Sequence, residues 1–228
     1  MFKKYISTKI IPVAVVETEE EIRNIADLSS EYLPAIELTM RTEYSYKALE
    51  ILAKYYPDLP RAAATVISKE QVDKILDLGT NIIISPGFQT NMLEYAKNKN
   101  YDYIPGVATP SEIEQCLSYG HKYLKFFHAG VFGGIEWLKG VGAVYSHTGE
   151  KFRQPVGDIE QRGQQANIAA GQDVAGENFR DRGVKAFAGE IEQRVAQPDG
   201  QQDMATPVAI TRIKFAFIAN RRSVRRGF

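Results

Sequence analysis

Residues 35–41, AIELTMR, decide the fold of this chain. Side chains alternate between the two faces of a strand, so Glu37, Thr39 and Arg41 share one face and the aliphatic residues between them share the other. A strand buried between two layers of helices would be apolar on both faces. One polar face and one apolar face instead predict a barrel that holds polar chemistry inside and packs on helices outside.

The same unit, a short apolar run followed by an amphipathic helix, recurs from Ile10 to about Leu138. We expect strands at residues 11–16, 35–41, 61–67, 81–86 and 103–108, and a sixth that begins at Tyr123. Thr18, Ser68 and Thr109 are the expected helix caps. Strict alternation of strands and helices demands right-handed crossovers and a parallel sheet. The fold class predicted is α/β, a (β/α)8 TIM-type barrel.

The last third of the sequence fits this pattern poorly. Composition changes near Gly149, and residues 150–155 and 184–189 are weak candidates for the seventh and eighth strands. Residues 212–228, RIKFAFIANRRSVRRGF, end in a basic cluster that we interpret as a solvated tail rather than an anion-binding patch. We therefore predict a single barrel domain over residues 1–228, with an atypical portion over 150–228.

Residues 123–134, YLKFFHAGVFGG, place a lysine in the middle of the sixth strand. Lys125 shares a strand face with Tyr123 and Phe127. An ammonium held among apolar side chains loses hydration, which lowers the pKa of Lys125 toward the range in which its free amine attacks a carbonyl. This is the requirement for a Schiff-base lysine. The alternative is that Lys125 extends from an edge strand into water.

Glu37 needs a partner, because a lone inward carboxylate is costly. An ion pair with Arg41 that only holds the interior together would meet this need. We favour a functional interpretation, in which Glu37 moves protons while the amine of Lys125 becomes a carbinolamine and then an imine. The Arg41 guanidinium would then bind the carboxylate of a keto acid.

Overall composition excludes several classes of protein. The formal net charge is zero, so no attraction to nucleic acid or anionic membrane is implied. The single cysteine, Cys116, permits no internal disulfide and is expected to be a small core residue in a reducing compartment. The apolar runs are too short to span a membrane, and the start of the chain lacks a signal-peptide cleavage segment. From the absence of such segments we expect a cytoplasmic location. His121, His128 and His147 lack metal-ligand spacing, so we expect no metal.

The runs KIIPVAVV, IELTMRT, AAATVIS, ISPG, IPGVATPSE and LKFFHAG resemble, in order and spacing, the class I aldolases that cleave 2-keto-3-deoxy-6-phosphogluconate (KDPG) and often also 4-hydroxy-2-oxoglutarate (KHG). The resemblance covers about residues 8–149. It implies a homotrimeric barrel that uses no cofactor. Lys125 would be the imine-forming lysine and Glu37 the general acid and base.

The same resemblance implies substrate contacts at Arg41, Thr65 and Pro86, with Phe127 beside the imine. The substrate would be a small keto acid, cleaved to pyruvate plus D-glyceraldehyde 3-phosphate or glyoxylate. A protonated imine is an electron sink that stabilises the carbanion left when the carbon–carbon bond breaks.

The chain departs from the family pattern in several places. Its third strand has AAATV where the family usually has GAGTV, a mild change. His128 stands where the family has proline, and its parity predicts a packing or rim residue. The glycine-rich turns that receive the substrate phosphate correspond to PVGDI at 155–159 and AGEI at 188–191. Asp158 and Glu190 would put carboxylates beside a dianion, which repels it. The alternatives are a catalytically impaired or ligand-binding barrel without an intact phosphate site, specificity for unphosphorylated KHG, or a tail from a hybrid or frameshifted gene.

Overall fold

The computed structural model describes residues 1–7, 10–33, 35–145, 151–156 and 213–218. The helices in these ranges are α1 (Phe2–Ser7), α2 (Glu19–Tyr32), α3 (Ser45–Tyr55), α4 (Lys69–Asp77), α5 (Thr90–Lys99), α6 (Pro110–Ser118) and α7 (Gly134–Val144). The strands are β1 (Ile10–Ala14), β2 (Ile36–Thr39), β3 (Arg61–Ala64), β4 (Ile82–Ile84), β5 (Asp102–Ile104), β6 (Gly106–Val107), β7 (Tyr123–Phe126), β8 (Lys151–Val156) and β9 (Ile213–Ile218).

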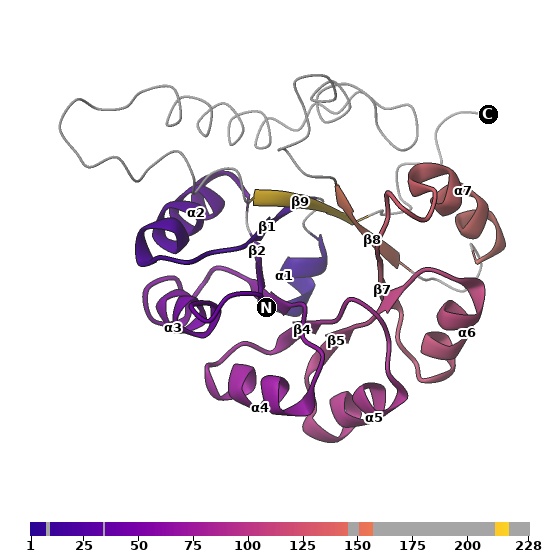
Figure 1. Ribbon diagram of the computed structural model, residues 1–228, viewed down its shortest axis with the longest axis horizontal. Coiled ribbons are helices and arrows are strands. Elements are labelled where there is room, and N and C mark those ends of the chain that lie inside the picture. The colour runs from indigo at the N-terminus through magenta and orange to yellow at the C-terminus, as the bar shows by residue number, and fades with distance from the viewer. Residues whose placement is uncertain (8–9, 34, 146–150, 157–212, 219–228) are drawn as a thin grey trace.

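The described strands form one sheet in the order β5-β4-β3-β2-β1-β9-β8-β7-β6. Strands β1 to β5 pair in parallel, as do β6, β7 and β8. β5 and β6, at the two ends of this order, are separated in the chain only by Pro105. Figure 1 shows the sheet curving around α1, with α2 to α7 on its outside. The predicted α/β class and the six expected strand positions are confirmed.

The C-terminal strands depart in part from expectation. β8 occupies the position predicted for the seventh strand, whereas the predicted eighth strand at 184–189 lies outside the described residues. β9 pairs antiparallel with both β1 and β8. The sequence pattern predicts no strand at residues 213–218, although the β-branched and aromatic residues of this segment suit one. The interpretation as a solvated tail concerns the basic cluster that follows it. The basic residues at 221–226 are outside the described ranges.

The two faces of the sheet carry different residues, as the alternation in 35–41 predicts. Ile36 and Leu38 pack with buried side chains of α2 to α5 in one core cluster. A second cluster lies on the face that surrounds α1, and its buried members are Tyr5, Ile11, Ala35, Ala62, Ala64, Ile82, Ile84 and Ile104. Glu37 therefore belongs to the inner face.

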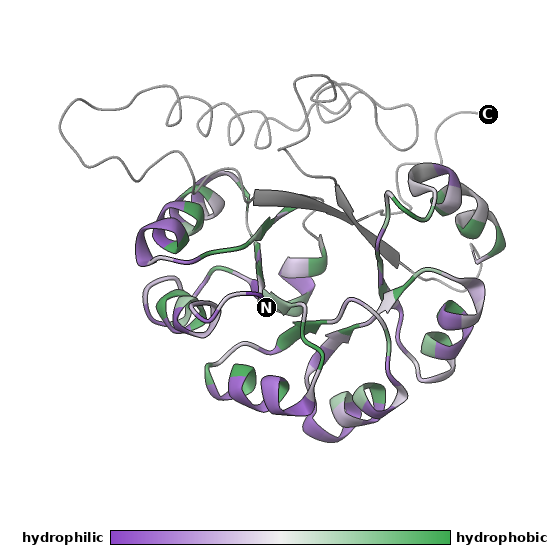
Figure 2. Ribbon diagram, viewed as in Figure 1, coloured by the Kyte–Doolittle hydropathy of each residue, from purple (hydrophilic) through white to green (hydrophobic). Residues whose placement is uncertain are grey.

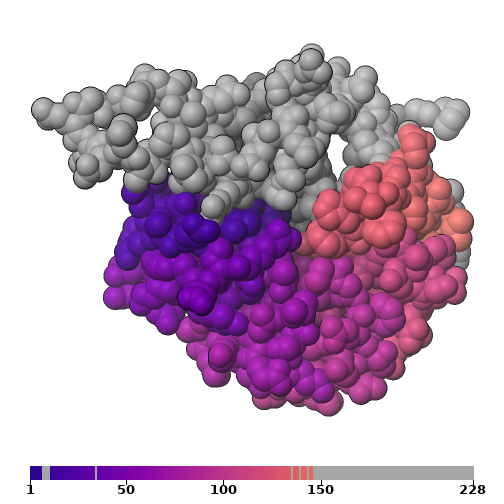
Figure 3. All heavy atoms as spheres, in the orientation of Figure 1, coloured from indigo at the N-terminus to yellow at the C-terminus, as the bar shows by residue number. Residues whose placement is uncertain are grey.

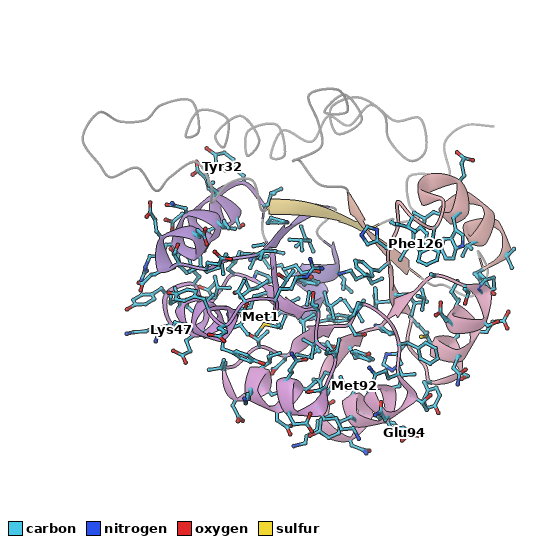
Figure 4. All side chains as sticks on the ribbon, in the orientation of Figure 1. Met1, Tyr32, Lys47, Met92, Glu94 and Phe126 are labelled. Atoms are coloured by element: carbon cyan, nitrogen blue, oxygen red, sulfur yellow. The ribbon has the colours of Figure 1, made fainter. Side chains whose placement is uncertain are left out.

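The helices turn their apolar sides toward the sheet. Figure 2 shows hydrophobic residues on the inward sides of the outer helices and hydrophilic residues on their outward sides. In Figure 4, Lys47 and Glu94 lie at the outer edge while Met92 and Phe126 lie between helices and strands. Side chains fill the space that the ribbon leaves between these layers (Figure 3).

Side-chain caps fix where the helices begin. Thr18 and Thr109 each form a capping box, with Glu21 and Glu112 respectively, and Ser68 accepts a hydrogen bond from the Gln71 N–H. All three predicted caps are confirmed. The helices that these residues cap all follow loops at the carboxyl ends of parallel strands, the edge at which such folds place their sites.

Cys116 is fully buried beside Val107 and Leu124, which confirms its predicted place in the core. The Trp137 ring stacks on Phe126 with centroids 4.0 Å apart, so α7 is anchored to the strand that carries Lys125. Within the described parts of the chain, no helix combines the length and the apolar character that a bilayer crossing requires.

Candidate active site

Lys125 projects from β7 toward the inside of the curved sheet. Its neighbours Leu124 and Phe126 are fully buried on the other face, Leu124 within the cluster that includes α6 and α7. Lys125 pairs in register with Gly106, and its backbone N–H donates to the Pro105 carbonyl at 2.9 Å. Only 6% of the residue is exposed. The alternative in which Lys125 extends from an edge strand into water is therefore wrong.

The ammonium of Lys125 faces the carboxylate of Glu37. Nζ donates to Oε1 of Glu37 at 3.0 Å, and Glu37 has no exposed surface. The hydroxyl of Tyr5 donates to the other oxygen, Oε2, at 3.4 Å. The partner that the structure gives this carboxylate is thus Lys125, whereas the alternative based on the sequence paired it with Arg41.

A buried pair at this distance is suited to proton transfer. Burial disfavours the charged form of each group, while each charge favours the other. The separation between Lys125 and Glu37 is within the range over which a general base removes a proton. Glu37 can therefore take a proton from the amine and return it without a change of position.

Phe127 follows β7 directly and forms one wall beside the amine. Its ring centroid lies 5.2 Å from Lys125 Nζ, a distance typical of a cation–π contact. The side chain is half-buried. The structure thus places Phe127 beside the amine that would carry an imine.

Arg41 and Thr65 follow the carboxyl ends of β2 and β3 and touch each other. Arg41 Nε donates to Thr65 Oγ1 at 3.3 Å. The Arg41 side chain is exposed, and Thr65 has a left-handed backbone with φ of 63°. This pair leaves a guanidinium accessible at the edge of the sheet where β7 also ends.

Pro86 lies in the loop after β4, which a buried network holds against β5. Ser85 Oγ shares a hydrogen bond of 2.6 Å with the Tyr103 hydroxyl and donates to the Gly87 carbonyl. Burial raises the pKa of Tyr103 to about 12, so this hydroxyl stays neutral at physiological pH. The loop that carries Pro86 is therefore fixed from beneath by a neutral hydrogen-bonded pair.

Gly106 also shapes the candidate site, although the sequence analysis does not single it out. A Cβ at this position would lie 2.0 Å from the Pro86 carbonyl oxygen, so only glycine lets β6 approach the Pro86 loop. The same residue pairs with Lys125 in the sheet. The sequence signal was the glycine of IPG itself, inside a predicted strand, where glycine often marks a close backbone approach.

The sequence also gives no sign that Tyr5 reaches the site, because the pattern at the start of the chain indicates only a possible targeting segment. α1 is six residues long, too short to show helical periodicity. His128 is exposed, with its ring 4.9 Å from that of Phe127, as expected of a rim residue. Asp158 and Glu190, which bear on the phosphate turns, lie outside the described residues. Across the ranges that the structure covers, no three His, Cys, Asp or Glu side chains gather as a metal site requires.

Comparisons with known proteins agree on one family. A family model described as KDPG and KHG aldolase matches residues 2–176. The 2-dehydro-3-deoxy-phosphogluconate aldolase of Haemophilus influenzae is 31% identical over 147 residues, 64% of this chain and 69% of that protein. The KHG/KDPG aldolase of Escherichia coli K12 is 32% identical over 140 residues, 61% of this chain and 66% of its own length.

Solved structures give the same result. The KDPG aldolase of Legionella pneumophila, with pyruvate captured as a covalent carbinolamine, has a TM-score of 0.61 and 34% identity over 65% of this chain and 71% of that one. The KDPG aldolase of Zymomonas mobilis ATCC 29191 has a TM-score of 0.64 and 25% identity over 80% of this chain and 91% of that one. The matches to the two curated relatives span about two thirds of their lengths.

Proposed function

Because this chain belongs to the family of KDPG and KHG aldolases, we propose that it is a class I aldolase that cleaves KDPG, KHG or both through an imine on Lys125. The observation that carries the proposal is the buried contact of 3.0 Å between Lys125 Nζ and Glu37 Oε1. An amine nucleophile and a general base within hydrogen-bond reach are the two groups that imine chemistry requires.

The first half of the reaction builds the imine. Glu37 removes a proton from the ammonium of Lys125, and the free amine attacks the C2 carbonyl of the keto acid. The carbonyl oxygen gains a proton and forms the carbinolamine. Loss of this hydroxyl as water, with protons exchanged through Glu37, leaves a protonated imine between Nζ and C2.

The second half breaks the carbon chain. Glu37 takes the proton of the C4 hydroxyl, the C3–C4 electron pair moves into the imine, and the aldehyde leaves. The resulting enamine takes a proton at C3, and water hydrolyses the imine to pyruvate and the free amine of Lys125. The protonated nitrogen accepts the electron pair, which lowers the barrier to bond cleavage.

Residues at the edge of the sheet would bind the rest of the substrate. The exposed guanidinium of Arg41, held by Thr65, is suited to an anionic group of the keto acid. Phe127 would exclude water beside the imine, and the Pro86 loop would bound the other side. The sequence likeness that aligns Asp158 and Glu190 with the phosphate-binding turns supports the unphosphorylated substrate KHG, because carboxylates there would oppose a phosphate dianion.

We further propose that the sheet closes as a (β/α)8-type barrel in one domain and that three copies assemble. Closure is supported by β5 and β6, which stand at opposite ends of the strand order yet are joined through Pro105. A homotrimer, a cytoplasmic location and a reaction without cofactor are supported by the family likeness. Light scattering on the purified protein would give the mass of three chains, and a monomeric mass would contradict the assembly.

Trapping with borohydride tests the proposed function. Pyruvate plus sodium borohydride should add one reduced adduct, and peptide mapping should place it on Lys125. A Lys122→Met variant, which removes a nearby exposed lysine, is the matched control and should label as the wild type does. An unmodified Lys125 in folded protein would contradict the proposal. Cleavage assays with KDPG and KHG then decide the substrate, and trapping without cleavage of either would identify a ligand-binding barrel.

A further inference from the structure

α1, the helix that contains Tyr5, lies within the curve of the sheet (Figure 1). Tyr5 has no exposed surface and packs in the inner cluster with Ile11, Ala62, Ile82 and Ile104. A tyrosine hydroxyl buried among apolar groups requires a hydrogen-bond partner. Its position in α1 directs that hydroxyl to Glu37.

Tyr5 and Lys125 contact different oxygens of Glu37. Tyr5 donates to Oε2 at 3.4 Å, and Lys125 donates to Oε1 at 3.0 Å. The Tyr5 contact is longer than an ordinary O–H···O hydrogen bond, as contacts of catalytic groups often are before substrate binds. Because each donor has its own oxygen, the hydroxyl does not compete with the amine for Oε1.

The contact of the Tyr5 hydroxyl with Oε2 restrains rotation of the Glu37 carboxylate. The terminal torsion of glutamate has a broad minimum, so packing alone fixes the direction of its oxygens poorly. A donor on Oε2 defines the plane of the group and therefore the direction in which Oε1 points. A general base whose reactive oxygen is misdirected loses rate even when its nucleophile is intact.

We propose that Tyr5 is a positioning residue for the aldolase reaction, which holds Oε2 of Glu37 so that Oε1 faces Lys125 and the reacting carbon atoms. The inference rests on the proposed function. Tyr5 acts through Glu37, so its loss slows the proton transfers of the reaction, whereas the amine still reaches the same imine at equilibrium.

Tyr5→Phe tests the proposal, because it removes the hydroxyl and keeps the ring that fills the core. Two readouts separate the steps: borohydride trapping after equilibration with pyruvate reports the stability of the imine, and exchange of the pyruvate C3 hydrogens in heavy water reports the rate of proton transfer. We expect the final amount of adduct and the half-saturating pyruvate concentration to stay within about twofold of wild type. The exchange rate at saturation should fall about tenfold, the effect of losing one hydrogen bond to a charged group.

Tyr56→Phe is the matched control. Its hydroxyl donates to the Asp27 carboxylate at 2.7 Å on the exposed side of the chain, so both readouts should match the wild type. Unchanged exchange in folded Tyr5→Phe would overturn the proposal. A fall in the final amount of trapped adduct at saturating pyruvate would also overturn it, since Tyr5 would then act on the amine itself.

Carbon-13 NMR of glutamate carboxyls keeps this test independent of turnover. The Glu37 signal, identified as the one lost in Glu37→Gln, should move in Tyr5→Phe and stay in place in Tyr56→Phe. 3-Fluorotyrosine at position 5 is a second variant, which keeps the hydroxyl as a stronger donor and should move the signal in the opposite direction. If the wild type takes no pyruvate label, the proposed function fails. The Glu37 signal then still decides whether Tyr5 holds this carboxylate. A Glu37 signal that does not move in Tyr5→Phe overturns the inference.

Discussion

Lys125 Nζ and Glu37 Oε1 lie 3.0 Å apart although the two residues are separated by 88 positions in the chain. Their strands, β7 and β2, are not neighbours, because β8, β9 and β1 stand between them in the sheet. The contact therefore runs across the inside of the curved sheet rather than along it. Side chains that meet across this space depend on the curvature, which links the site to the integrity of the whole sheet.

Removal of one member of this pair should destabilise the protein strongly. Lys125→Met leaves the Glu37 carboxylate buried without its cation, and we expect the free energy of unfolding to fall by about 3–5 kcal/mol. The double variant Lys125→Met/Glu37→Gln carries no charge at either position and should recover a large part of this loss. Urea denaturation followed by circular dichroism measures both values.

An exposed ion pair between a lysine and a glutamate is the control for this experiment. Lys47 and Glu50 form an ion pair of 2.7 Å whose side chains are 59% and 46% exposed, so water screens the interaction. Lys47→Met should leave the unfolding midpoint unchanged within error. A loss in Lys125→Met that is as small as in Lys47→Met would show that the site pair is solvated.

Arg41→Ala should weaken substrate binding without loss of stability. The Arg41 side chain is exposed and contacts Thr65, so its removal leaves no buried group unsatisfied. Loss of a guanidinium that binds a carboxylate should raise the half-saturating pyruvate concentration in borohydride trapping about tenfold or more. Arg23→Ala, at an exposed arginine paired with Glu19, is the control. Equal pyruvate dependence in both variants would exclude Arg41 from the binding site.

The inner face of β2 and the burial of Lys125 could be predicted from the sequence, because both follow from the alternation of side chains along a strand. The predicted strand at 103–108 appears as β5 and β6, since Pro105 has no N–H to donate and interrupts the ladder. The local sequence pattern thus predicts most of the strands, whereas the break between β5 and β6 depends on the missing N–H of Pro105.

Tyr5 and β9 were not predictable in this way, since both depend on contacts between distant parts of the chain. Tyr5 gains its role from a carboxylate 32 positions later. Residues 213–218 have a strand-like composition, but their antiparallel place between β1 and β8 is set by the open edges of those strands rather than by any local signal.

Cys116 should resist thiol reagents in the folded protein. Burial raises the pKa of Cys116 to about 12, whereas an exposed thiol ionises near about 8.5. Between these values the unfolded chain loses the thiol proton and the folded protein keeps it, so this group contributes stability that is full below the unfolded value and is lost as pH rises. Iodoacetamide labelling at pH 9 should be slow without urea and fast with it.

The same thiol predicts a pH dependence of unfolding. Cys116→Ala should show a smaller fall in unfolding free energy between pH 8 and 10 than the wild type, measured in urea at each pH. Because the chain has a single cysteine, all labelling reports this position. Rapid labelling of folded protein at pH 9, or identical slopes in the two proteins, would show that Cys116 is accessible.

Two truncations test whether β9 is an integral part of the sheet. β9 pairs with β1 along residues 10–14 and with β8 along residues 153–156, so its removal would leave two strand edges unpaired. Unpaired edges expose backbone N–H and C=O groups and promote aggregation.

A chain that ends at Ile218 keeps β9, and a chain that ends at Arg212 lacks it; the two differ by six residues. We expect the shorter chain to lose cooperative thermal unfolding and borohydride trapping, whereas the longer chain keeps both, because Glu37 and Lys125 meet only across an intact curved sheet. Equal stability and equal trapping in the two chains would show that β9 contributes nothing to the fold or to the site.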